Sequence, residues 1–161
     1  MIKKPFHYGG TVDNQHFCNR TSEIKELTTD IDTGLNLLLY APRRFGKTSL
    51  VLHTLGQTQY QYIFLDFMSI VDEHEFINEY FNAISKSLNT TADKVVEFFK
   101  KILKIKPNIS VDFDIRGSPS FKLNFLQKEN SVVLKEVLEL PFLYAKYHNK
   151  RVVVVFDEFQ E

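Results

Sequence analysis

Hydrophobic residues recur at the three- and four-residue spacing of amphipathic helices over much of the chain. The spacing is clearest over residues 72–88, where the apolar positions are Phe76, Ile77, Tyr80, Phe81, Ile84 and Leu88. Other stretches with this spacing are residues 21–34, 48–55, 92–104 and 129–140. Thr21 and Gly34 are residue types typical of the first and last positions of a helix. Pro141 predicts the start of a second short helix to about Asn149.

Continuous apolar runs and one alternating run predict the strands. The runs "NLLLY" at 36–40, "QYIFLDF" at 61–67 and "VVVVF" at 152–156 are too short for helices and indicate buried strands. Residues 109–125 instead alternate apolar and polar on either side of "RGSP", which predicts a β-hairpin with one apolar face. Buried strands that alternate with helices predict an α/β fold with a parallel central sheet and helices on both faces. At 161 residues, we expect residues 1–161 to form a single domain.

Composition narrows the class of protein. The chain has 20 basic and 20 acidic side chains, so its zero net charge and the lack of a basic stripe argue against a nucleic-acid partner. Cys18 is the one cysteine, and the five histidines lack the spacing of metal ligands, so the sequence predicts no cysteine or histidine metal site. The N-terminus does not resemble a signal peptide and no apolar run approaches a membrane span, so we expect a cytoplasmic protein without a membrane partner.

The stretch "APRRFGKTSL", residues 41–50, predicts a phosphate-binding loop. It lies between a predicted strand and a predicted helix, so backbone N–H groups and the helix dipole can converge on an anion. Lys47 would reach the outer phosphates, the Thr48 hydroxyl would bind Mg²⁺, and Gly46 would allow close approach of the backbone. Ala41 occupies a position where such loops often have Gly, so it must avoid a positive φ or accept strain. The alternative is a structural turn.

The stretch "VVVVFDEFQ" places Asp157 and Glu158 at the carboxyl end of a predicted buried strand. Ligands of open α/β sheets bind at these ends. An aspartate there can hold Mg²⁺, and an adjacent glutamate can act as general base toward water. The alternative is an acidic pair that ends a strand in solvent. Asp66 also ends a predicted strand, and we expect it to be structural.

Four stretches give the chain a resemblance to the prokaryotic P-loop ATPases of the AAA+/STAND superfamily. They are "FCNRTSEIKEL", "LLLYAPRRFGKTSL", "YIFLDF" and "VVVVFDEFQ". The resemblance implies a three-layer sandwich and the ligands ATP and Mg²⁺. The hairpin predicted at 109–125 is unusual in such a core and would be an insertion. It implies a metal-side role for Asp157 and Thr48 and a catalytic role for Glu158. The residues it implies near the nucleotide are Phe17, Arg20, Ala41, Pro42, Arg43, Arg44, Phe45, Gly46, Lys47, Thr48 and Ser49.

Some of these implied positions have alternatives. Phe17 and Arg20, with Asn19, match a segment that family members place near adenine, but they also fit an ordinary entry into a helix. Arg43 and Arg44 could touch phosphate or a partner subunit, or be solvated. The hairpin is expected to pack on its own domain and is also the best candidate for a partner surface.

The resemblance also implies a further strand, inserted between the loop strand and the acidic strand. That strand would follow Glu158, so we expect the chain to be an N-terminal fragment that lacks later strands. The intact protein would hydrolyse ATP to drive a conformational change. The alternative is a nucleotide-dependent switch with little turnover. Besides the nucleotide, the expected partner is a second copy of the chain or the missing C-terminal domain.

Overall fold

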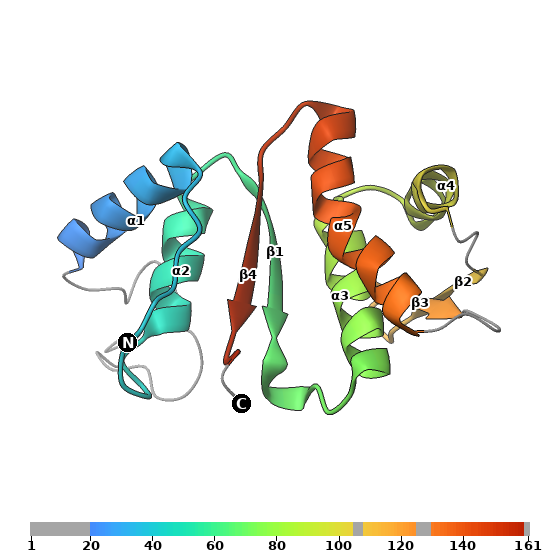
Figure 1. The fold of residues 1–161 in the computed structure, drawn as a ribbon, viewed down its shortest axis with the longest axis horizontal. Coiled ribbons are helices and arrows are strands. Elements are labelled where there is room, and N and C mark those ends of the chain that lie inside the picture. The colour runs from blue at the N-terminus through green and yellow to red at the C-terminus, as the bar shows by residue number, and fades with distance from the viewer. Residues whose placement is uncertain (1–19, 105–107, 125–129, 160–161) are drawn as a thin grey trace, which may run out of the picture. The chain divides into compact units, whose positions relative to one another are not determined.

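The computed structural model describes residues 20–104, 108–124 and 130–159. The chain divides into two compact units, Met1–Tyr60 and Gln61–Glu161, and each is described by itself. Figure 1 shows the helices and strands of both units along the chain.

The first unit contains the helices α1, Thr21–Thr33, and α2, Lys47–Gly56, which pack against each other. Leu27 and Ile31 form the buried stripe of α1. Gly34 ends α1 in the left-handed conformation with φ 77°, which the sequence predicts and which a residue with a Cβ adopts only with strain. The two helices predicted in this part of the chain are therefore confirmed.

The buried strand predicted at 36–40 is wrong. Residues 35–42 lie in neither a helix nor a strand, and large apolar side chains in this stretch are open to solvent. Leu38 is 91% exposed and Tyr40 is 92% exposed. A strand needs a neighbouring strand to satisfy its backbone groups, and the described part of the first unit contains none. The apolar run alone therefore does not produce a strand.

In the second unit, the strands β1, Gln61–Asp66, and β4, Val152–Asp157, form a two-stranded parallel sheet. Their register pairs Ile63 with Val154 and Asp66 with Asp157, so both strands end together. Ile63, Leu65, Val152 and Val154 pack into a core with the helices α3 and α5, which lie along one side of the sheet (Figure 1). The two predicted strands are confirmed.

The helix α3, Glu73–Ser87, is the centre of the second unit. It contacts β1, α5 and the hairpin, and its residues Ile77, Tyr80, Phe81 and Ile84 are buried. Asp72 caps its N-terminus by accepting a hydrogen bond from the amide of Glu75 at 2.7 Å. The helix α4, Ala92–Ile102, adds Val95 and Phe99 to the same core.

The predicted hairpin is confirmed as the antiparallel strands β2, Asn108–Phe113, and β3, Pro119–Asn124. At the turn, Asp114 Oδ1 accepts hydrogen bonds from the amides of Arg116 and Ser118, both at 2.8 Å. Phe121 and Leu123 of β3 are buried in the core that contains α3. The hairpin therefore packs its apolar face on its own unit, as the sequence predicts.

A single helix replaces the two helices predicted after residue 129. The helix α5, Asn130–His148, contains Pro141 in its interior. A proline removes one backbone hydrogen bond from a helix. Here Val137, Leu140 and Tyr144 are buried along one face that continues through the proline, and this burial offsets the lost bond.

The architecture is mixed α/β. In the described residues, the parallel sheet has two strands and the hairpin forms a separate antiparallel sheet. The full three-layer sandwich is therefore not present in this part of the chain. None of the described helices is long and apolar enough to cross a membrane.

Candidate functional site

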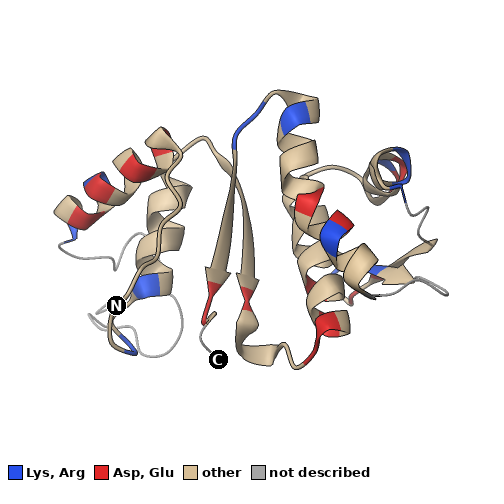
Figure 2. Ribbon diagram, viewed as in Figure 1, with Lys and Arg blue, Asp and Glu red and all other residues tan. Residues whose placement is uncertain are grey.

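The predicted phosphate loop leads directly into α2. Gly46 precedes the helix in the left-handed conformation, with φ 70° and ψ 30°, and its carbonyl accepts the amide of Leu50 at 2.9 Å. Lys47 is the first residue of the helix. Figure 2 shows this basic residue at the start of α2. The N–H groups of a first helical turn point toward the preceding loop, so the local geometry suits an anion.

The Lys47 side chain folds back over the loop. Its Nζ donates a hydrogen bond to the carbonyl oxygen of Ala41, 3.1 Å away, which closes the loop on itself. Ala41 does not have a positive φ, so its side chain causes no backbone strain at this position, where such loops often have glycine. The residue that bears strain is Arg44, with φ 67°. The sequence did not predict this conformation, because no residue pattern indicates a positive φ at an arginine.

Arg20 holds the loop from the start of α1. Its Nη1 donates to the carbonyl oxygens of Phe45 at 3.0 Å and Gly46 at 3.4 Å. Its Nε and Nη2 donate to the Glu23 carboxylate at 2.9 and 2.6 Å. The hydrogen bonds and charge of this pair raise the pKa of Arg20 and lower the pKa of Glu23. Arg20 therefore lies at the predicted site, through contacts with the loop backbone that the sequence did not indicate.

The other loop residues differ in exposure. Pro42, Arg43, Arg44 and Phe45 are exposed, and the carbonyl of Pro42 accepts the amide of Phe45 at 3.3 Å to form a turn. Thr48 is half-buried, and the side chain of Ser49 is buried inside the unit. Phe17 and Asn19 lie outside the described residues.

The predicted acidic pair lies at the carboxyl end of β4 in the second unit. Asp157 ends that strand beside Asp66, which ends β1, and Figure 2 shows acidic residues at both strand ends. Asp157 Oδ1 accepts a hydrogen bond from the amide of Glu158 at 3.1 Å. Glu158 has φ 51°, so the chain turns sharply after the strand. This strain is a second feature that sequence reasoning missed.

Aromatic rings pack beside the acidic pair. Phe67 makes edge-to-face contacts with Phe156 at 5.4 Å and with Phe159 at 5.2 Å between ring centroids. Phe156 and Phe159 are the residues that flank Asp157 and Glu158 in the sequence. The rings thus anchor both sides of the sharp turn that carries the two carboxylates.

Asp66 has the structural role that the sequence predicts. Its carboxylate accepts a hydrogen bond from the amide of Met68 at 2.9 Å and caps the short 3₁₀ helix η1, Phe67–Ser69. Asp66 therefore acts as a helix cap, and the candidates for a chemical role at these two strand ends are Asp157 and Glu158.

A magnesium ion carried by a nucleotide needs fewer protein oxygens than a stand-alone metal site. Within the ranges that the structure describes, no group of three or more histidine, cysteine or acidic residues could hold a metal. Mg²⁺ in phosphate sites usually takes one or two protein oxygens and completes its shell with phosphates and water. The hydroxyl of Thr48 and the carboxylate of Asp157 are oxygens of the required kind. They belong to different units, and each is described by itself.

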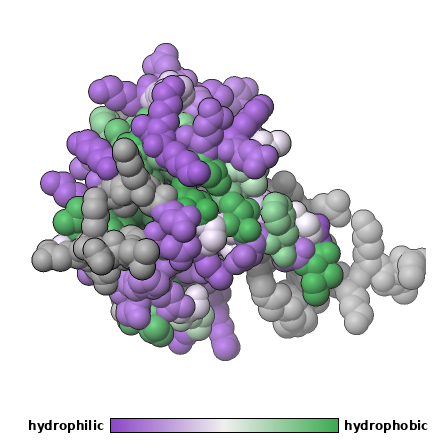
Figure 3. Space-filling model, turned by 90° about the vertical axis from the view of Figure 1, so that its right-hand side faces the viewer, coloured by the Kyte–Doolittle hydropathy of each residue, from purple (hydrophilic) through white to green (hydrophobic). Residues whose placement is uncertain are grey.

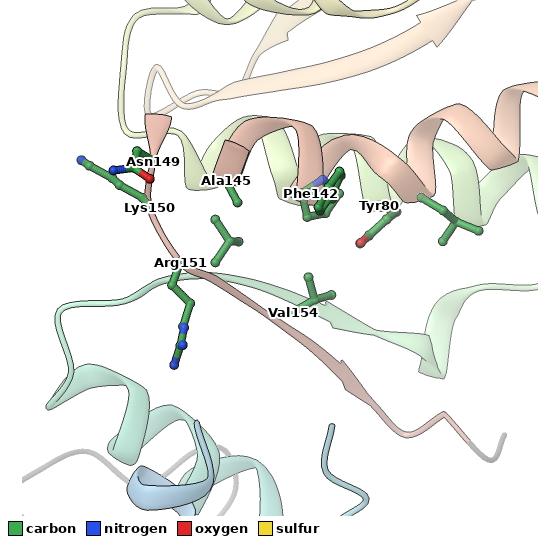
Figure 4. Close-up of a pocket in the computed structure, with 10 residues that line it drawn as sticks. Tyr80, Phe142, Ala145, Asn149, Lys150, Arg151 and Val154 are labelled. Atoms are coloured by element: carbon green, nitrogen blue, oxygen red, sulfur yellow. The ribbon is translucent and has the colours of Figure 1, made fainter. Parts of the chain in front are cut away.

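The second unit also contains a pocket of about 640 Å³, which no predicted site residue lines. It lies between α5 and β4 (Figure 4). Phe142 and Val154 provide apolar walls, and Lys150 and Arg151 lie at one end. Tyr80 points its hydroxyl into this pocket (Figure 4), and burial raises the pKa of Tyr80 to about 12.

Comparison with known proteins assigns the chain to no family. No family model, curated protein or solved structure matches the chain. The case for a function therefore depends on the loop, the acidic pair and the chemistry that their residues allow.

Proposed function

We propose that the chain is the nucleotide-binding part of a P-loop ATPase and that it binds ATP with Mg²⁺ through the loop 41–49. The observation that carries this proposal is the geometry of Gly46 and Lys47. A left-handed glycine opens α2, and the lysine that follows it reaches back over the loop to the carbonyl of Ala41. In this position the ammonium group can exchange one carbonyl contact for phosphate oxygens without a change in the backbone.

Each loop residue has a defined role in this proposal. The Lys47 ammonium neutralises charge on the outer phosphates, and the first turn of α2 adds N–H donors and the positive end of its dipole. Arg20 keeps the carbonyls of Phe45 and Gly46 turned toward itself, and the amides of Gly46 and of the first turn of α2 would then face the anion. Thr48 and Asp157 would hold Mg²⁺, which supplies charge neutralisation on the phosphates.

Hydrolysis would depend on Glu158. A carboxylate at the carboxyl end of a strand can accept a proton from a water molecule as that water attacks the γ-phosphate. The Asp157 hydrogen bond and the neighbouring rings fix the sharp backbone turn from which the Glu158 side chain extends. The second candidate is a switch that binds ATP with little turnover.

The three-layer sandwich belongs to this proposal as well. The exposed apolar side chains of residues 35–40 support it, because side chains of this kind normally pack against a neighbouring element. In the sandwich, another element of the protein would cover these side chains.

Turnover by matched variants separates the two candidates. We expect Glu158→Gln to abolish phosphate release from MgATP while nucleotide binding persists. Glu139→Gln makes the same change at an exposed position of α5 and should leave the rate unaltered. Undetectable turnover by the unaltered chain, with binding retained, would select the switch. Turnover by Glu158→Gln equal to that of the unaltered chain would remove Glu158 from the chemistry.

A further inference from the structure

The two outer edges of the β2–β3 hairpin differ in the hydrogen-bond partners of their backbone groups. On the β3 side, the amide of Phe121 donates to Asn82 Oδ1 at 3.1 Å and the amide of Leu123 donates to Asn78 Oδ1 at 3.0 Å. Asn78 and Asn82 lie one turn apart on α3, so this helix closes the β3 edge with side-chain acceptors at the spacing of the strand amides.

The outer edge of β2 has no backbone partner among the described residues. The register places Ile109 opposite Leu123 and Val111 opposite Phe121. Because the amides of Phe121 and Leu123 point away from β2, antiparallel geometry turns the backbone N–H and C=O groups of Ile109 and Val111 away from β3. Phe113 follows in the same alternation. Among the described residues, no third strand pairs with β2 and no backbone hydrogen bond reaches these outward groups.

The exposed side chains of the hairpin lie next to this edge. Phe113 is 64% exposed, and Ile115 in the turn is fully exposed. Figure 3 faces the side of the molecule on which Figure 1 places α4, β2 and β3, and it shows apolar residues open to solvent among hydrophilic ones. An open strand edge with adjacent apolar side chains is a template for pairing with another strand.

We propose that β2 pairs through this edge with β2 of a second copy of the chain. The two strands run antiparallel about a two-fold axis at Val111, so Val111 lies opposite the partner's Val111. Ile109 then lies opposite the partner's Phe113 on the apolar side. The two hairpins form one continuous four-stranded sheet, and the outward backbone groups of both copies bond to each other.

The polar side of β2 is self-complementary in this register. Ser110 lies opposite the partner's Asp112. Asn124 Nδ2 donates to Ser110 Oγ at 3.1 Å, so the Ser110 hydroxyl keeps its hydrogen for the partner's carboxylate. Asp112 Oδ2 pairs with Lys122 at 3.3 Å within the hairpin, and its other oxygen can accept that hydrogen. The register shifted to place Asp112 opposite the partner's Asp112 is opposed by like charge.

Sedimentation across a dilution series tests whether two copies of the chain form a dimer. We expect a monomer–dimer equilibrium in which Ser110→Asp, by placing a carboxylate opposite the partner's Asp112 twice per dimer, raises the dissociation constant about tenfold. Within one hairpin the new aspartate lies opposite Lys122, so the variant should remain folded. Adding Asp112→Asn to Ser110→Asp should restore the dimer. Ser131→Asp, an exposed position of α5, is the control of equal charge.

Hydrogen exchange locates the interface. The amides of Val111 and Phe113 should become protected as the chain concentration rises, while the amide of Ser110, bonded inside the hairpin, should be protected at every concentration. A chain that is monomeric throughout would overturn the proposal. A dimer that tolerates Ser110→Asp, or that leaves the Val111 amide in fast exchange, would do so as well, because another surface would then form the contact.

Discussion

Thr54 is buried in the last turn of α2, and its hydroxyl oxygen has no hydrogen-bond partner. A buried hydroxyl without a partner destabilises the folded state, because it has lost its bonds to water. We expect Thr54→Val, which has nearly the same shape, to raise the free energy of unfolding by about 1 kcal/mol. Denaturant titration of both proteins measures this, and a lower midpoint for Thr54→Val would show that the hydroxyl is satisfied in solution.

Arg20 links the start of α1 to the loop 41–49 through hydrogen bonds to the loop backbone. Arg20→Ala removes its donors to the carbonyls of Phe45 and Gly46, and we expect the free energy of unfolding to fall by about 1 kcal/mol. Arg43→Ala, at an exposed position of the same loop, is the matched control and should change stability little. Equal effects of the two substitutions would show that the Arg20 contacts do not support the loop.

Tyr80 should make the stability of the second unit depend on pH in the alkaline range. Burial raises its pKa from 10.0 to about 12, so the folded state favours the neutral phenol. The stability that this preference contributes is complete below pH 10 and is lost as pH rises toward 12. We therefore expect the chain to lose stability relative to Tyr80→Phe over that window. Denaturant midpoints at a series of pH values measure the difference, and a constant difference would contradict the shift.

At the scale of elements, the helices were the most predictable part of the fold. The core of the second unit depends on apolar residues at helical spacing in α3, and that spacing is visible in the sequence. The stretch 36–40 shows the opposite case, because an apolar run becomes a strand only when another strand satisfies its backbone. Pro141 shows a third case, in which burial of one helical face outweighs a local signal for a break.

The candidate site was predictable in its residues and less so in its geometry. The pattern of Gly46 and Lys47 indicated a loop that opens a helix, and the structure has that loop. The positive φ angles of Arg44 and Glu158 could not be predicted, because they follow from packing around the turns and not from residue type. The contacts of Arg20 with the loop join residues 25 and 26 positions apart, which no local pattern encodes.

The attachment of the hairpin to α3 is an element-scale feature that can be tested. We expect Asn82→Ala to lower the free energy of unfolding by about 1–3 kcal/mol, because the amide of the buried Phe121 loses its acceptor. Asn82→Asp keeps an acceptor oxygen and should retain most of the stability. Denaturant unfolding compares the three proteins, and equal stability of the alanine and aspartate variants would show that the bond contributes little.

At the scale of the whole molecule, the two compact units divide the proposed chemistry. The first unit carries the loop that would grip phosphates, and the second carries the carboxylates that would handle metal and water. In this proposal the loop has to bind the nucleotide first, since the acidic pair has no role until a nucleotide is held. The net charge of zero offers no long-range attraction for a polyanion, so affinity has to come from the local geometry around Lys47.

Calorimetric titration of the chain with MgATP tests this claim most directly. We expect saturable heat for the unaltered chain and its loss in Lys47→Ala, because the ammonium group supplies the charge that the loop amides lack. Lys25→Ala removes the same charge from an exposed position of α1 and should leave the titration unchanged. No saturable heat with the unaltered chain, or the same affinity for Lys47→Ala, would contradict the account.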